Sequence, residues 1–159
     1  MRGLSDENAM TPENEYLLQK ARHFCDYQER CIHEVREKLK TWKARPDVIE
    51  QLIVKLENEG YIDEDRYVRA FALGKLRHNK WGRNKIIFAL RQKKIPELII
   101  QIGLQEIDSE EYLHALRAVI SAKHIDETDA HKRKAKLAQY AIQKGFQPSL
   151  VWKVINEED

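Results

Sequence analysis

The chain has 159 residues, of which 42% are apolar and 34% are charged, and its formal net charge is +2 at neutral pH. This composition is typical of an ordered, helix-rich protein with one ordinary domain or a short array of small units. The longest uninterrupted apolar run, residues 86–90, is too short to span a bilayer, and the opening MRGLSDENAM lacks the apolar core of a signal peptide. We therefore expect a cytoplasmic protein without membrane contact, and interpret residues 1–10 as a flexible tail or expression remnant.

Apolar residues recur at intervals of three and four along almost the whole chain, which is the spacing of amphipathic helices. The pattern is clear in residues 32–42, 48–56 and 113–120, and no alternating pattern typical of a strand has a useful length. Prolines stand where helices are expected to begin. The sequence therefore predicts an all-α fold.

The prolines also mark an internal repeat. PDVIEQL at Pro46, PELIIQI at Pro96 and PSLVWKV at Pro148 share a proline, a polar residue and two apolar residues. They stand about 50 residues apart, a period typical of repeat proteins. Each repeat is predicted to hold three helices, with boundaries at residues 11–63, 64–108 and 109–159.

Two similar acidic segments, IDEDRY at 62–67 and IDSEEY at 107–112, stand at the junctions between repeats. The three adjacent carboxylates of the first segment could bind Mg²⁺ or Ca²⁺. The shared pattern favours a helix start instead, because Asp63 and Asp108 would each cap backbone N–H groups, worth about 1 kcal/mol. The acids that follow face the positive end of the helix dipole, and the isoleucine and tyrosine are spaced as a hydrophobic staple. We expect structural caps here and no metal.

No motif for catalysis or for cofactor binding stands out. The glycines never cluster as phosphate-binding loops require, and H-E-x-x-H, C-x-x-C, G-x-S-x-G and EF-hand patterns are absent. A zinc site could be drawn from His23, Cys25, Cys31 and His33, but the H-x-C and C-x-H spacings do not match the usual ligand pairs. Two free thiols are the favoured interpretation. We expect neither an enzyme nor a bound cofactor.

The small net charge hides a strong asymmetry. Residues 66–94 contain ten basic residues and no acid, and a charge distribution of this kind attracts anions even when the total is near zero. The candidate binding residues are Arg66, Arg69, Lys75, Arg77, Lys80, Arg83, Lys85, Arg91, Lys93 and Lys94, with a second cluster at Lys132, Arg133, Lys134 and Lys136.

The basic segment has three interpretations. Lysines and arginines around Trp81 are typical of a phosphate-contacting surface, although a solvated helical face would have the same composition, and Trp81 is predicted to pack in the core rather than to stack on a base. A helix-turn-helix would use residues 82–94 as its recognition helix. Ile86, Ile87 and Phe88 occupy the middle of that helix, which makes sequence-specific DNA reading the weaker alternative.

Four segments, in this order and spacing, resemble the RecX family, the bacterial regulatory proteins of the RecA recombinase. They are YQERCIHEVREKL, LENEGYIDEDRYVRAF, KWGRNKIIFALRQKKI and KRKAKLAQYAIQKGF, and the likeness covers about residues 21–155. Where family members commonly carry a serine at the start of the second helix, this chain carries Cys31, which corresponds to Gly82 in the next repeat.

The resemblance implies three tandem three-helix repeats in an elongated, curved array, and a mechanism without catalysis. A protein of this kind would lie in the groove of the RecA–DNA filament, or cap its growing end. It would restrain strand exchange, ATP hydrolysis and coprotease activity, and so act in homologous recombination, DNA repair and the SOS response. The resemblance also implies direct binding of single- or double-stranded DNA through the basic patch, by a monomer. The alternative is a sequence-tolerant DNA-binding helical protein without a RecA role.

Overall fold

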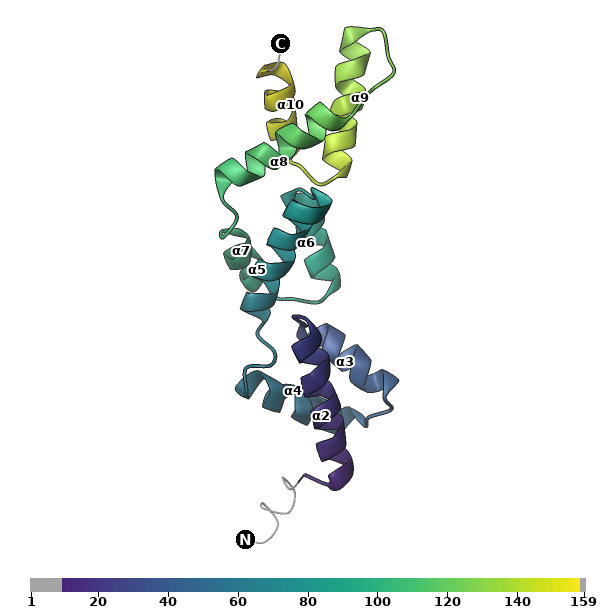
Figure 1. Cartoon of the computed structure of the whole chain (residues 1–159), viewed down its shortest axis with the longest axis vertical. Helices are drawn as coiled ribbons and strands as arrows, with labels where there is room; N and C mark the ends of the chain where they lie inside the picture. The colour runs from purple at the N-terminus through teal and green to yellow at the C-terminus, as the bar shows by residue number, and fades with distance from the viewer. Residues whose placement is uncertain (1–9, 158–159) are drawn as a thin grey trace. The chain divides into compact units, whose positions relative to one another are not determined.

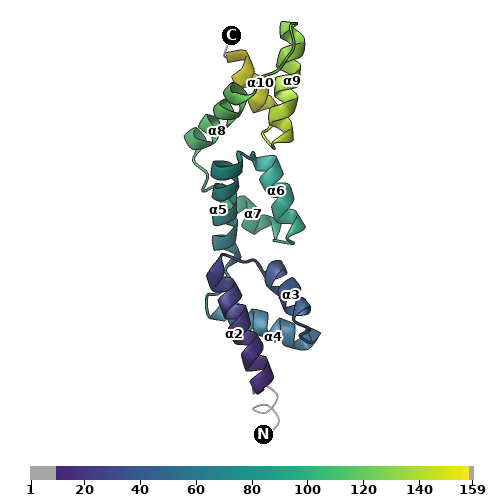
Figure 2. The same cartoon turned by 45° about the vertical axis from the view of Figure 1, so that its right-hand side comes forward.

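The structure, a computed structural model, describes residues 10–157, so most of the predicted tail and the last two residues lie outside the described part. Within that part the chain is all-α, as predicted, with nine α-helices, one π-helical turn and no strand (Figures 1 and 2). The elements are α2 (Pro12–Tyr27), α3 (Ile32–Thr41), α4 (Pro46–Asn58), α5 (Glu64–Gly74), η1 (Lys75–Asn79), α6 (Arg83–Gln92), α7 (Glu97–Leu104), α8 (Ser109–Ala122), α9 (Ala130–Gln143) and α10 (Pro148–Glu157). None of these helices is both long and apolar enough to cross a membrane.

The chain divides into two compact units, one ending at Tyr67 and one beginning at Val68. The first unit holds α2, α3, α4 and the first turn of α5, and the second holds the rest of α5 and every later element. The boundary falls close to the predicted seam after Asp63, whereas the predicted seam after Asp108 lies inside the second unit. The division into repeats at 11–63, 64–108 and 109–159 stays a prediction.

The joint between the second and third helices is the same in each three-helix set. A backbone N–H donates to the carbonyl five positions earlier, from Ala44 to Leu39 (3.0 Å), from Ile95 to Leu90 (3.5 Å) and from Phe146 to Ala141 (3.3 Å). The residue before each donor has a positive φ, 62° at Lys43, 58° at Lys94 and 104° at Gly145. A left-handed residue of this kind closes a helix and turns the chain. The repeat found in the sequence therefore has a counterpart in the backbone.

Packing in the first unit follows the helical spacing of the sequence. Five of the six apolar residues of α4 between 48 and 56 are buried, Val54 being the exposed one, and they share one apolar cluster with Leu18 of α2 and Leu39 of α3. The three helices of this set are seen together in Figure 1. Burial of this kind contributes about 25 cal/mol for each Å² of apolar surface removed from water, and it holds the set together.

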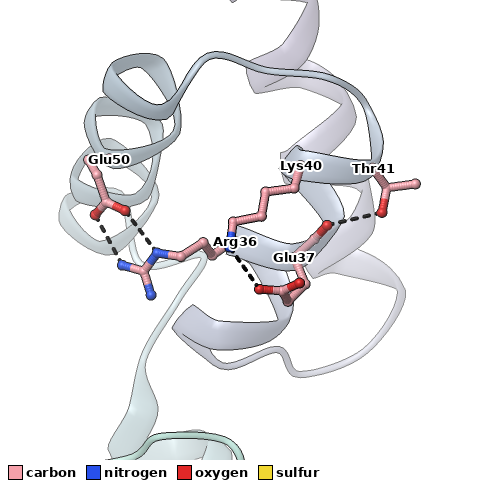
Figure 3. A network of polar contacts seen from close by, with 5 residues as sticks. All are labelled: Arg36, Glu37, Lys40, Thr41 and Glu50. Atoms are coloured by element: carbon pink, nitrogen blue, oxygen red, sulfur yellow. Dashed lines mark hydrogen bonds and ion pairs between the residues drawn. The ribbon is translucent and has the colours of Figure 1, made fainter.

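Exposed ion pairs lie on the surface of this unit, within α3 and between α3 and α4. Arg36 of α3 donates two hydrogen bonds to Glu50 of α4, at 2.8 and 3.0 Å, and Lys40 pairs with Glu37 at 3.1 Å (Figure 3). The bonded guanidinium holds the pKa of Glu50 below its usual value. Pairs this exposed contribute about 0–1 kcal/mol each, so they orient the helices more than they stabilise them.

The acidic segment at the start of α5 packs on the start of α3. Asp63 Oδ1 accepts a hydrogen bond from the backbone N–H of Arg66 at 3.0 Å, and Glu64 Oε2 accepts one from the N–H of Ile32 at 3.2 Å. Tyr67 is 5% exposed, and its side chain is hydrogen-bonded to those of Glu34 and Cys31. Burial raises the pKa of Tyr67. These acids thus bond to backbone donors at two helix starts.

The corresponding segment at the start of α8 packs on the start of α6. Asp108 Oδ2 accepts from the N–H of Glu111 at 3.0 Å. The hydroxyl of Tyr112 accepts from the N–H of Arg83 at 3.0 Å and donates to Gln147 Oε1. Tyr112 is 4% exposed, and burial raises its pKa. Each segment therefore joins the first helix of one set to the second helix of the set before it.

Two glycines let the backbones of α6 and of the α9–α10 turn approach each other within the second unit. The N–H of Gly82 donates to Lys144 O at 2.8 Å, and the N–H of Asn84 donates to Gly145 O at 2.9 Å. A Cβ at Gly82 would lie 2.3 Å from Phe146 N, and a Cβ at Gly145 would lie 2.4 Å from Lys85 Cβ. Only glycine fits such a close approach, which explains why WGRNKI and KGF occur together.

Candidate interaction surfaces

Three arginines of the basic segment are neutralised by carboxylates from elsewhere in the chain. The pairs are Arg66 with Glu29, Arg77 with Glu111 at 2.6 Å, and Arg91 with Glu97 at 2.6 Å. The hydrogen-bonded guanidinium of Arg77 lowers the pKa of Glu111, and that of Arg91 lowers the pKa of Glu97. The field of residues 66–94 is therefore weaker than their lack of acids indicates, because the partners lie outside the segment.

Arg83 is held by contacts within the fold. Its backbone N–H donates to Tyr112, its Nη1 donates to Leu104 O at 3.3 Å, and its guanidinium lies 4.9 Å from the centre of the Tyr112 ring. These contacts connect the starts of α6 and α8 with the end of α7. A change at Arg83 would disturb the fold as well as any surface, so it is a poor probe of binding.

Two of the remaining cations lie on the ring of Trp81. Lys75 Nζ lies 4.8 Å and Lys85 Nζ 4.6 Å from the centre of its ring, and Lys80 is the residue before it in the chain. No ion pair with a carboxylate is found for these three lysines, or for Arg69 and Lys94, within residues 10–157. We call Lys75, Lys80, Trp81 and Lys85 the Trp81 patch. Its cations are available to an external anion.

The prediction that Trp81 packs in the core is wrong. Trp81 is partly exposed, while Leu76 and Ile86 on either side of it are fully buried. These two aliphatic side chains occupy the core positions. The Trp81 ring therefore lies at the surface, where Lys75 and Lys85 contact it. The backbone N–H of Trp81 donates to Lys75 O at 3.1 Å and closes the π-helical turn, and Lys80, which follows that turn, has a φ of 55°.

The second basic cluster lies on the first turns of α9. Glu127 Oε2 pairs with Lys136 at 2.8 Å, which lowers the pKa of this carboxyl, and Glu127 O accepts a hydrogen bond from Arg133 at 3.0 Å. Asp129 caps the helix by accepting from the backbone N–H of Lys132 at 2.9 Å. Part of this cluster is therefore used to hold the α8–α9 loop.

The acids and cysteines considered for a metal site have structural surroundings instead. The described residues contain no group of three or more His, Cys, Asp or Glu side chains placed to hold a metal ion. Cys25 and Cys31 are buried free thiols, and burial raises their pKa to about 11 and about 12, so neither is a ready thiolate ligand at neutral pH.

A further basic and aromatic surface, absent from the sequence prediction, lies on α2 and α3. Its residues line a pocket of about 680 Å³, and none of them is acidic. We call it the α2–α3 cradle; it is lined by Gln19, Lys20, His23, Phe24, Tyr27, Arg30, Lys38 and Trp42. No local pattern could indicate it, because it combines residues of α2 and α3 with Arg30 and Trp42, which lie just beyond the ends of these helices.

Comparison with known proteins decides the family. Family models of the first, second and third three-helix domains of RecX match residues 18–56, 63–104 and 110–155. A regulatory protein RecX from Clostridium acetobutylicum is 31% identical over 153 residues, covering 91% of this chain and 71% of its own length. The chain belongs to the RecX family. The resemblance seen in the sequence is thus confirmed.

Other RecX proteins extend the comparison. Regulatory protein RecX from Lactobacillus johnsonii is 30% identical over 149 residues, covering 91% of this chain but 54% of its own length. A crystal structure of RecX from Lactobacillus salivarius superposes with a TM-score of 0.83 at 20% identity, covering 93% of this chain and 97% of that one. A second RecX crystal structure gives 0.82 at 22% identity. These similarities confirm the all-α fold with three three-helix domains.

Proposed function

We propose that this RecX-family protein restrains the RecA recombinase by binding the RecA–DNA filament, in its groove or at its growing end. It acts by occupying a surface and not by catalysis, so strand exchange, ATP hydrolysis and coprotease activity fall together. The protein works in the cytoplasm as a monomer. Membership in a family of regulatory proteins supports this proposal, as does a repeated helical architecture that offers several surfaces to a helical partner.

The observation that carries the proposal is the Trp81 patch. Lys75 and Lys85 lie on the Trp81 ring with Lys80 next to it in the chain, and none of the three forms an ion pair with a carboxylate in the described chain, so they can pair with phosphates or with acidic side chains of the filament. Arg66, Arg77 and Arg91 are already paired, so they contribute less. Charge complementarity of this kind favours rapid association and correct orientation.

The test replaces Lys75, Lys80 and Lys85 together by glutamine. If each lysine contributes about 0.5 kcal/mol, the concentration that halves RecA-driven ATP hydrolysis on single-stranded DNA should rise about tenfold. The matched control replaces Lys40, Lys55 and Lys153 by glutamine, which removes the same charge from exposed positions outside the patch. Equal inhibition by the two triple variants and the parent chain would contradict the role of the patch.

A second candidate function, sequence-tolerant DNA binding without a RecA role, is favoured by the lysines stacked around Trp81. It predicts tight DNA binding by the protein alone and no effect on RecA beyond competition for DNA. The logarithm of its affinity should fall by about 0.7 to 0.9 for each phosphate contacted per tenfold rise in salt. Inhibition of RecA at salt concentrations that abolish direct DNA binding would exclude it.

A further inference from the structure

We propose that the α2–α3 cradle binds single-stranded nucleic acid, with bases stacked on Tyr27 and Trp42 and phosphates paired with Lys20, Arg30 and Lys38. The site belongs to the first unit, whereas the Trp81 patch belongs to the second, and it needs no RecA. The proposal therefore goes beyond the proposed function and can fail independently of it.

The rings of the cradle provide the stacking surfaces. Tyr27, at the end of α2, is 82% exposed although it is a large aromatic residue. Phe24 and Trp42 meet edge to face, with ring centres 6.2 Å apart and planes at 77°, and both are only partly buried. Phe24 thus braces the Trp42 ring from the side. Stacking of a base on such a ring tolerates any sequence, because every base has a π-face.

The cations of the cradle are placed on rings and not on carboxylates. Lys20 Nζ lies 4.3 Å from the centre of the Trp42 ring, Arg30 Cζ lies 3.7 Å from that of Phe24, and Lys38 Nζ lies 5.5 Å from that of Phe24. Within residues 10–157 none of the three has an ion-pair partner. Elsewhere on α3 the cations are matched, since Arg36 pairs with Glu50 and Lys40 with Glu37 (Figure 3).

Two kinds of cation give the cradle a fixed part and a movable part. Arg30 Nε donates to Phe24 O at 3.0 Å, so its guanidinium is anchored at the end of α2 and keeps further N–H groups for a phosphate. Lys20 has a flexible stem and one ammonium group over Trp42. It can turn from the ring to a phosphate when a base takes its place on the indole.

The chemistry of the cradle favours a nucleic-acid strand over an acidic peptide. The cradle is bordered by two helices and by no strand, so it has no sheet edge to which an extended peptide could add as a further strand. A nucleic-acid strand needs only ring faces and positive charge. The absence of any acid from the lining residues removes the repulsion that a phosphate would otherwise meet.

The experiment measures binding of a fluorescein-labelled oligothymidylate to the full chain, without RecA, by fluorescence anisotropy. Tyr27→Ala should bind about fivefold to a hundredfold more weakly, which is the effect of losing one stacked base. Tyr27→Phe should bind as the parent chain does, because stacking does not use the hydroxyl. Phe88→Ala is the control, since Phe88 is a 64% exposed aromatic residue of the second unit that does not line the cradle.

An abasic oligomer with the same number of phosphates separates stacking from charge. The parent chain should bind it more weakly than oligothymidylate, and the Tyr27→Ala change should have no further effect on it. Equal binding of the two oligomers by the parent chain, or equal oligothymidylate binding by Tyr27→Ala and the parent, would overturn the proposal. In a variant with Trp81 and Trp152 replaced by phenylalanine, quenching of Trp42 fluorescence by a poly-glutamate peptide but not by oligothymidylate would also overturn it. Helicity by circular dichroism verifies that Tyr27→Ala is folded.

Discussion

The turns that begin α5 and α8 have the same sequence pattern but contact different surfaces. In the first turn Tyr67 meets side chains, the carboxylate of Glu34 and the thiol of Cys31. In the second, Tyr112 meets the backbone N–H of Arg83, beside the close approach of Gly82 and Gly145. A repeated motif thus conserves the position of one tyrosine while the chemistry opposite it changes.

The difference follows from one position of the repeat. Cys31 and Gly82 both precede the second helix of their sets, and Cys31 fills its space with a fully buried side chain. Glu34 Oε1 then accepts from the N–H of Cys31 at 3.1 Å. At Gly82 another backbone takes the place of the side chain, and the N–H donates to Lys144 O. The stability of the contact at Cys31 should therefore depend on the chemistry of the side chains that form it. The stability of the contact at Gly82 should depend on the volume of the residue at that position.

The largest expected effect is at the glycine contact. Gly82→Ala should destabilise the protein by about 3 kcal/mol, because its Cβ would lie 2.3 Å from backbone atoms that cannot move aside. Gly74→Ala is the matched control, since no atom lies within 4 Å of its Cβ and its helical φ of −62° suits alanine. It should stabilise the protein by about 0.5–1 kcal/mol. Urea unfolding followed by circular dichroism measures both, and a Gly82→Ala variant as stable as the parent would disprove the close contact.

A smaller effect is expected from removing the two tyrosine hydroxyls. Tyr112→Phe should cost about 2 kcal/mol, because it leaves the N–H of Arg83 and the side-chain amide oxygen of Gln147 without that partner. Tyr67→Phe should cost about 1 kcal/mol, since Glu34 keeps its bond to the N–H of Cys31. The same unfolding measurement ranks the two, and the reverse order would mean that the side-chain contact is the stronger.

A loss of stability at alkaline pH, divided between two thiols, is expected in the first unit. Burial raises the pKa of Cys25 to about 11 and of Cys31 to about 12, against about 8.5 for an unfolded thiol. Between these values the folded thiol keeps a proton that the unfolded one has lost. Stability is therefore fully present below about pH 8.5 and is lost as the pH rises through the folded pKa, by about 1–2 kcal/mol per thiol at pH 10.

Unfolding midpoints at pH 8 and pH 10 check this prediction. The double variant Cys25→Ala, Cys31→Ser lacks both thiols, so its stability should change less between the two pH values than that of the parent chain. An equal change in both proteins would show that other groups, such as buried Tyr67, account for the alkaline loss.

Local patterns predicted most of the fold. Helical spacing identified the buried row of α4, Pro46 and Pro148 stand at the first positions of their helices, and Pro96 directly precedes α7. The π-helical turn at Lys75–Asn79 was not predicted, because its sequence continues the helical pattern of α5. Gly82 and Gly145 were visible only as parts of motifs, since their contact joins positions far apart in the chain.

The interaction surfaces were less predictable for the same reason. The basic segment contains no acid, but Arg66 pairs with Glu29 and Arg77 pairs with Glu111. No local pattern could indicate these ion pairs, because the partners lie far away in the chain. The α2–α3 cradle combines residues of two helices, so it emerges only when these pack. Which basic residues contact RecA and which contact DNA stays a prediction.

The most direct test of the central claim is a titration of this protein into preformed RecA filaments on single-stranded DNA. ATP turnover and filament length are followed together, by a coupled assay and by electron microscopy of the same samples. We expect both to decrease as the protein is added, and we expect the variant with Lys75, Lys80 and Lys85 replaced by glutamine to require about tenfold more protein. ATP turnover and filament length that remain unchanged at saturating protein would contradict it.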